Sequence, residues 1–339
     1  MRRTQGIFVA SLAILMAGLP AGADGPAADP ALTAAAQPTP PVPGKKLDDA
    51  TIERILKLQD QEEVAVRVVL IPASVEDKHG RVVTGLKAND FQLSDEKVPQ
   101  QIKYFSIEND APVAIAFVLD VSGSMRQSGK LDAAKEAIRF FVDQLRPQDR
   151  FALICFADEQ VSWVTQFTSD RTVFLERLAV QEGYGQTALN DAVAATPKLV
   201  DEASTGRKAI VLITDGVDNA SKLTVYDAVK TARHVEVPIY SIGFSTLPWE
   251  TNRKPTDLTT NMGVLKMFAD ETGGDTFVVQ DPDEMKEAVD KISTSLRYQY
   301  LIGYSPGLQR WDGHFRSIQL QARNGRYVVK TRKGYYANP

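Results

Sequence analysis

The chain has 339 residues, a formal net charge of −4, 43% hydrophobic residues and 24% charged residues. This length is sufficient for two domains of ordinary size, and the composition is that of a soluble globular protein. The small net charge argues against a nucleic-acid-binding protein and against electrostatic binding to an anionic membrane surface.

The N-terminus predicts export. Arg2 and Arg3 precede an apolar stretch, residues 6–19, and Ala21-Gly22-Ala23 forms a small-x-small cleavage site. This pattern is typical of a secretory signal peptide, residues 1–23, that is cleaved after Ala23. The apolar stretch is too short to span a bilayer comfortably. We therefore expect a secreted or periplasmic protein with no membrane span after cleavage.

An Ala/Pro-rich segment, residues 24–47, follows and is expected to be a disordered or extended linker. The single cysteine, Cys155, excludes an internal disulfide, and its apolar neighbours indicate a small buried side chain rather than a reactive thiol. Export without disulfides suggests a bacterial protein.

Residues 48–110 predict the first part of a small β domain. Hydrophobic residues alternate between residues 63 and 75, which is typical of a strand with one buried face. Two shorter strands are predicted at residues 91–93 and 101–107. No internal repeat is present.

The middle of the chain, residues 111–297, alternates strand and helix patterns, which predicts a doubly wound α/β sheet. The run 113–119 is wholly apolar, as expected for a strand that is buried on both faces. The other predicted strands are 151–156, 161–167, 209–214, 239–244 and 277–279, and the predicted helices are 130–145, 171–178, 188–203, 224–235, 264–271 and 283–296.

Oxygen-bearing side chains follow two of these strands. The run 113–119 ends in Asp120-x-Ser122-x-Ser124, and the run 209–214 ends at Asp215. The carboxyl edge of an open α/β sheet is where ligands bind, so these residues are expected to lie near one another. Carboxylate and hydroxyl oxygens suit a hard divalent cation, Mg²⁺ or Mn²⁺.

A further hydroxyl is expected at the same edge. The glycine-rich loop 183–187 leads into the predicted helix 188–203 and presents Thr187 at its start. The candidate metal ligands are therefore Asp120, Ser122, Ser124, Thr187 and Asp215.

The C-terminal segment, residues 298–339, returns to a β pattern with three predicted strands. Three strands in about 40 residues are marginally stable alone. We expect them to pair with the strands before residue 110, so that the α/β domain is inserted into one small β-sandwich built from both flanks.

The five candidate ligands match the DxSxS…T…D pattern of the metal-ion-dependent adhesion site, and residues 112–297 thus resemble the von Willebrand factor A family. Residues 77–106 also resemble the segment ahead of the A domain in many secreted bacterial members. The resemblance implies a Rossmann-like, six-stranded, mostly parallel sheet with strand order 3-2-1-4-5-6, the third strand antiparallel.

The same resemblance implies roles for the ligands. Ser122, Ser124 and Thr187 would contact the cation directly, whereas Asp120 and Asp215 would act through water or move in and out of its coordination shell. A cation held by neutral hydroxyls and two carboxylates stays electrophilic, so it can accept an Asp or Glu side chain from a partner protein. The predicted function is metal-dependent protein binding.

Two other functions remain open. The protein could be a structural or assembly component of the cell envelope whose metal site only stabilises the fold. It could also be a metal-dependent hydrolase, but Ser122 stands where the DxDxT phosphatase motif has its second acid. No histidine is spaced to serve Ser122 as a base, since His79, His234 and His314 are scattered. We therefore expect no enzymatic activity.

The segment 245–262 is longer than a usual strand-to-helix connection. It carries Trp249, Arg253 and Lys254. These residues could bind an acidic partner, or Trp249 could pack locally within a solvated insertion.

Overall fold

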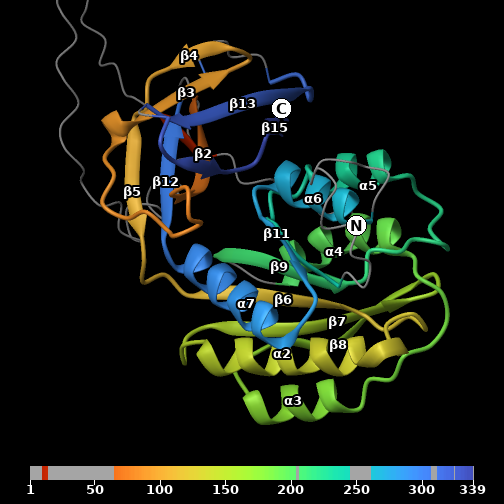
Figure 1. The fold of residues 1–339 in the computed structure, drawn as a ribbon. Coiled ribbons are helices and arrows are strands. Elements are labelled where there is room, and N and C mark those ends of the chain that lie inside the picture. The colour runs from red at the N-terminus through yellow and green to blue at the C-terminus, as the bar shows by residue number, and fades with distance from the viewer. Residues whose placement is uncertain are drawn as a thin grey trace, which may run out of the picture.

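The computed structural model describes residues 10–13, 65–203, 206–244, 261–306, 311–323 and 325–338. An α/β domain occupies the lower part of Figure 1, and strands from both ends of the chain lie above it. The expected linker 24–47, the loop around Trp249 and most of the expected signal peptide fall outside the described residues. Of that peptide, Ala10–Ala13 forms strand β1.

The α/β domain is built on one six-stranded sheet with the order β11-β10-β9-β6-β7-β8. All neighbouring strands are parallel except β8, which runs antiparallel to β7. This is the predicted order, and the prediction is confirmed. The strands are β6 (Val113–Asp120), β7 (Arg150–Ala157), β8 (Gln160–Thr168), β9 (Arg207–Thr214), β10 (Ile239–Phe244) and β11 (Thr276–Val279).

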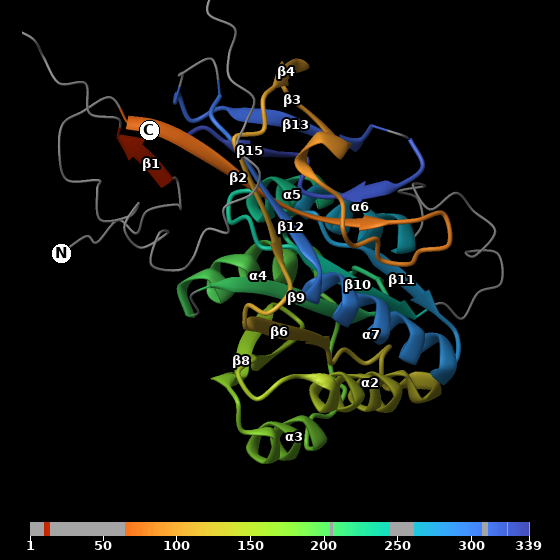
Figure 2. The same cartoon turned by 90° about the vertical axis from the view of Figure 1, so that its left-hand side faces the viewer.

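Helices cover both faces of this sheet, which is why all eight residues of the central strand β6 are buried (Figure 2). One face packs against α2 (Lys130–Gln144), α3 (Arg171–Ala179) and α7 (Pro282–Arg297). The other face packs against α4 (Leu189–Ala203), α5 (Val225–Ala232) and α6 (Asn261–Thr272).

The helix boundaries have local causes. Asp281 caps α7 by accepting from the backbone N–H groups of Asp283 and Glu284, and Pro282 stands at the first helical position, where its missing N–H is not needed. Thr224 and Asp227 form a capping box at α5. The predicted helix 224–235 was too long at its C-terminal end, and the predicted helix 264–271 began three residues too late.

The flanking strands form two further sheets. One has the order β1-β2-β12-β5, with β14 also pairing with β2, and the other has the order β15-β13-β3-β4. Strands after the α/β domain thus pair with strands before it. Their bounds are β2 (Ala65–Glu76), β3 (Phe91–Asp95), β4 (Val98–Gln100), β5 (Tyr104–Glu108), β12 (Gln299–Tyr304), β13 (Phe315–Ala322), β14 (Val328–Lys330) and β15 (Gly334–Tyr336).

The two flanking sheets share one hydrophobic core. Buried side chains from β2 and β12 meet others from β3, β13 and β15. At its centre, the carboxylate of Asp95 accepts hydrogen bonds from the hydroxyls of Tyr304 (2.8 Å) and Tyr335 (3.0 Å). This contact joins β3 to the strands β12 and β15, which follow it by about two hundred residues in the chain.

A buried carboxylate joins the two points where the chain enters and leaves the α/β domain. Asp149 has no exposed area and accepts from the backbone N–H of Val113 (3.0 Å), at the start of β6. It also accepts from the guanidinium of Arg297 (2.7 Å), at the end of α7, and from the backbone N–H of Arg146 (2.8 Å). Burial opposes ionisation, but these hydrogen bonds prevail and hold the pKa of Asp149 below its usual range.

Replacing Asp149 by Ala is expected to lower the free energy of unfolding by about 3–5 kcal/mol, because it leaves the Arg297 guanidinium half-buried and without its carboxylate partner. Urea unfolding measures the change. Asp143→Ala, on the exposed side of α2, is the control and should change stability by no more than about 0.5 kcal/mol. Equal effects of the two substitutions would contradict this role for Asp149.

The same carboxylate should make stability depend on pH. Because folding lowers its pKa, the contribution of Asp149 is complete above the unfolded value of about 3.9 and is lost as pH falls through the folded value. The stability difference between wild type and Asp149→Asn should therefore shrink below about pH 4. A difference that stays constant down to pH 2 would show that folding does not lower the pKa of Asp149.

Candidate metal centre

Three loops meet at the carboxyl edge of the six-stranded sheet. They follow β6, precede α4 and follow β9, and each carries at least one of the five candidate ligands. The strands β6 and β9 are parallel neighbours, with Leu119 opposite Ile213, so Asp120 and Asp215 emerge from adjacent strand ends.

Asp120 is the last residue of β6 and has no exposed area. One carboxylate oxygen accepts from the backbone N–H of Ser122 (2.8 Å), and the other accepts from the hydroxyl of Thr214 (2.6 Å). Burial raises the pKa of Asp120 to about 6, and the charge of nearby Asp215 acts in the same direction, against the hydrogen bonds from Ser122 and Thr214. A positive charge beside this carboxylate would stabilise its ionised form.

The two serines present their hydroxyls together. Their Oγ atoms are 3.0 Å apart, Ser122 is buried, and Ser124 is half-buried. Between them, the backbone N–H of Gly123 donates to the carbonyl of Gly185 (3.0 Å) in the second loop. A Cβ at position 123 would lie only 3.1 Å from that carbonyl oxygen, so the glycine permits this approach of the two loops.

Thr187 is held from the opposite side by the third loop. Its backbone N–H donates to the side-chain oxygen of Asn219 (2.8 Å), and its carbonyl accepts from the backbone N–H groups of Asn219 (3.0 Å) and Ala220 (3.1 Å). None of these bonds uses the Thr187 hydroxyl, and the residue is buried, with a relative exposure of 1%. The second loop is thus fixed to both of its neighbours.

Asp215 is 4% exposed and forms an ion pair with Lys130, the first residue of α2. The Lys130 ammonium donates to one carboxylate oxygen of Asp215 at 2.9 Å, and the backbone N–H of Val217 donates to the other at 3.3 Å. Lys130 therefore neutralises one of the two acids of the centre.

The donor set fits a hard divalent cation. Hydroxyls from Ser122, Ser124 and Thr187 lie on loops that are hydrogen-bonded to one another, beside two buried carboxylates. Oxygen ligands with little net charge suit Mg²⁺ or Mn²⁺. With only two carboxylates, the set is distinct from a site built on three or more His, Cys, Asp or Glu residues, and the described part of the chain contains no such group.

Sequence reasoning missed three residues that shape this centre: Thr214, Asn219 and Lys130. Thr214 has the sequence environment of an ordinary last strand residue, and Lys130 has that of an ordinary helix start. Only Asn219, four residues after Asp215 in a polar loop, carried a signal, because Asn and Asp side chains often bond nearby backbone in such loops.

The histidines lie elsewhere. His79 is in the exposed turn after β2, His314 is exposed beside Asp312 (3.2 Å), and His234 stacks on Tyr336 of β15 with ring centroids 3.5 Å apart. Cys155 is a free, buried residue of β7, and burial raises the pKa of its thiol to about 12. A thiol with this pKa is unreactive at neutral pH.

Comparison with known proteins gives the following matches. Residues 114–291 match the von Willebrand factor type A domain. The chain is 30% identical over 212 residues to a UPF0353 protein of Mycolicibacterium vanbaalenii and 29% identical over 212 residues to one of Mycolicibacterium gilvum. Each match covers 56% of this chain and 62% of the relative, so the chain spans less than two thirds of either protein.

Two solved structures are similar to this chain at low sequence identity. A von Willebrand factor type A protein from Catenulispora acidiphila is 16% identical with a TM-score of 0.46, and the match covers 73% of this chain and 74% of that chain. BatB from Bacteroides thetaiotaomicron is 23% identical with a TM-score of 0.41, and the match covers 55% of this chain and 98% of that chain.

Replacing Thr214 by Val should lower the free energy of unfolding by about 1.5–3 kcal/mol, because it removes a buried hydrogen bond to a carboxylate. Denaturant unfolding in EDTA measures the loss without any contribution from bound metal. Thr196→Val is the matched control, since its buried hydroxyl donates to the uncharged carbonyl of Ala192, and it should lose about 0.5–1.5 kcal/mol. A smaller loss for Thr214→Val than for Thr196→Val would contradict this role of Thr214.

Proposed function

Because the chain belongs to the von Willebrand factor type A domain family, we propose that it is a secreted protein-binding module that uses a Mg²⁺-type cation to recognise a carboxylate of a partner protein. The observation that carries this proposal is that the loops bearing Ser122, Ser124 and Thr187 are hydrogen-bonded to one another at the sheet edge where two buried carboxylates lie. A site with more protein carboxylates would satisfy the cation and leave little affinity for a carboxylate of the partner.

The residues of this centre would have different roles in binding the cation. The three hydroxyls would bind the cation directly, and Asp120 and Asp215 would balance its charge. The bound cation would supply an electrophilic position for an Asp or Glu side chain of the partner. Thr214 holds the carboxylate of Asp120 by a hydrogen bond of 2.6 Å, so this acid is oriented before any ligand arrives.

Lys130 would weaken metal binding. Its ammonium is bonded to Asp215, and a cation binding nearby would face its positive charge or displace it. An ion pair that must loosen before the metal is fully held would keep affinity moderate and reversible.

We propose further that the A domain, residues 111–297, is an insertion in a β-sandwich. The support is that β12 lies between β2 and β5 and that β13 pairs with β3, so each sheet contains strands from both flanks. Export to the periplasm or the cell exterior is proposed from the leader-like residues 1–23 alone. None of the described helices is both long enough and apolar enough to cross a membrane.

The first test is metal binding. Mg²⁺ or Mn²⁺ at about 100 times its Kd should add about 2.7 kcal/mol of stability and raise the Tm by roughly 5–10 °C relative to EDTA. Asp120→Ala should abolish the rise. Lys130→Met should move it to lower metal concentration, because a competing positive charge is removed, whereas Lys135→Met on the same helix should not. Identical melting in Mg²⁺ and EDTA would rule out the site.

The second test concerns the partner. Proteins retained by the immobilised wild-type chain from the secreted and periplasmic fractions of its source bacterium should be retained in Mg²⁺ and released by EDTA. Once a partner is isolated, Thr187→Ala should weaken its affinity more than it weakens metal affinity, because the change removes one neutral ligand and no charge. Thr294→Ala, on the exposed side of α7, is the control. Partner binding that is equal in EDTA and Mg²⁺ would leave the metal with a structural role only.

A further inference from the structure

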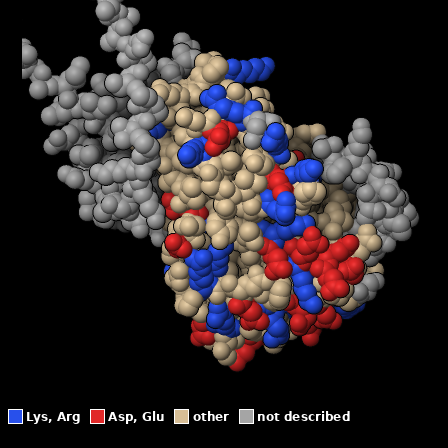
Figure 3. Space-filling view, turned by 60° about the vertical axis from the view of Figure 1, so that its left-hand side comes forward, with Lys and Arg blue, Asp and Glu red and all other residues tan. Residues whose placement is uncertain are grey.

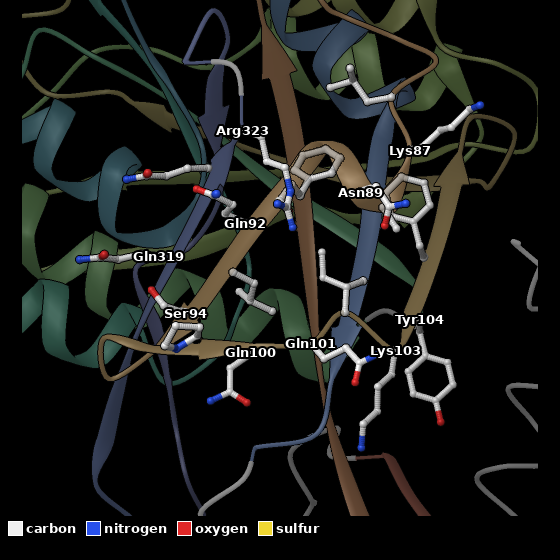
Figure 4. Close-up of a pocket in the computed structure, with 18 of the residues that line it drawn as sticks. Lys87, Asn89, Gln92, Ser94, Gln100, Gln101, Lys103, Tyr104, Gln319 and Arg323 are labelled. Carbon is white, nitrogen blue, oxygen red and sulfur yellow. The ribbon is translucent and has the colours of Figure 1, made fainter. Parts of the chain in front are cut away.

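A second candidate site lies in the flanking sheets, away from the metal centre. A groove of about 1550 Å³ lies between the edges of the two flanking sheets, one of which ends at β5 and the other at β4. Figure 4 shows part of its lining: Gln92 of β3, Gln319 of β13, Gln100 at the end of β4, and Gln101 and Lys103 in the connection to β5.

The floor of the groove is apolar. Phe105 and Ile107 of β5 stand opposite Ile302 and Tyr300 of β12, both buried, so all four side chains face the core between the sheets. Phe105 packs on Phe91 with ring centroids 5.9 Å apart. Yet Ile107 remains 36% exposed, since no described strand covers this end of the core.

The edge of β5 is available for pairing. Along the described chain, β5 pairs with β12 on one side and with no strand on the other. In an antiparallel edge strand, alternate residues point their N–H and C=O groups outward, where they can pair with an added strand. Five residues of β5 offer an edge of about 17 Å.

The charged side chains that line the groove are all positive. Four cations line it, Lys87, Lys97, Lys103 and Arg323, and none of its described lining residues is Asp or Glu. Lys97 interacts electrostatically with its neighbour Glu96, whereas Lys87 and Lys103 form no ion pair with the part of the chain that the structure describes. In Figure 3, acidic side chains gather on the lower half of the molecule, over the α/β domain, and are sparse over the flanking sheets above. This groove is thus a local cationic surface on a chain of net charge −4.

We propose that this groove binds an extended acidic peptide segment of a partner protein, added as a further strand at the free edge of β5. Main-chain hydrogen bonds would hold the segment, its apolar side chains would cover Phe105 and Ile107, and its acidic side chains would face Lys87 and Lys103. The volume exceeds the 300–1,000 Å³ of typical small-molecule pockets, as an extended chain requires. An unpaired strand edge above an apolar floor favours a peptide over an anionic polysaccharide, which offers neither a backbone donor ladder nor apolar side chains.

The test uses the full chain in EDTA, so that the metal centre cannot contribute, and a fluorescent decapeptide of alternating Glu and Val. Fluorescence anisotropy should show saturable binding at least about tenfold tighter than that of the Lys/Val decapeptide. The double variant Lys87→Glu/Lys103→Glu should weaken binding of the Glu/Val peptide at least about tenfold. Lys78→Glu/Lys230→Glu, two exposed lysines outside the groove, should leave it unchanged.

Amide hydrogen exchange identifies the edge. Bound Glu/Val peptide should slow several-fold the exchange of those amides among residues 104–108 that point away from β12. Failure of the peptide to bind at millimolar concentration would overturn the proposal, as would binding that is insensitive to the lysine substitutions or that leaves residues 104–108 unprotected. Tighter lysine-dependent binding of polygalacturonate would overturn it in favour of a glycan. Protection in the free chain of those amides among residues 104–108 that point away from β12 would overturn it in favour of the chain's own residues 24–64 as the occupant of the edge.

Discussion

The burial of Asp120 is the constraint on which the α/β domain depends. A carboxylate with no exposed area is unfavourable unless hydrogen bonds or a positive charge compensate for lost hydration. Here the compensation is partial: the hydroxyl of Thr214 and the backbone of Ser122 donate to it, while its pKa still lies well above that of an exposed Asp. The negative charge of Asp120 is thus only partly stabilised by its surroundings, and a cation bound at this sheet edge would stabilise it further. At Asp215, the chain itself supplies the stabilising positive charge through the ion pair with Lys130.

The sequence was informative wherever a residue's role follows from its neighbours in the chain. The wholly apolar run before Asp120 specified a central strand, and the alternation of strand and helix patterns specified a doubly wound sheet. The order of the six strands required the family resemblance, since no local pattern shows which strands become neighbours. The five candidate ligands were found from strand ends and spacing, and the structure places them on three loops that are bonded to one another.

The features that were missed depend on contacts across the fold. Thr214 and Lys130 matter because tertiary packing brings them to Asp120 and Asp215, which their own sequence environments do not reveal. In the flanks, β4 has three residues and no buried one, so it lacks the alternation that marks a strand. Likewise, β15 is only three residues long and follows a turn; it was not predicted, although it completes the second sheet.

The position of Asp149 determines how mechanical force would pass between the two halves of the molecule. The chain enters the A domain just after β5 and leaves it just before β12, and these strands are antiparallel neighbours with Glu108 opposite Gln299. A force that pulled these two connections apart would therefore act on both strands at the same end and break the hydrogen bonds between them one after another. Asp149 binds both Val113 and Arg297 at the root of that pair, so it would bear the tension before the first bond between β5 and β12 opens.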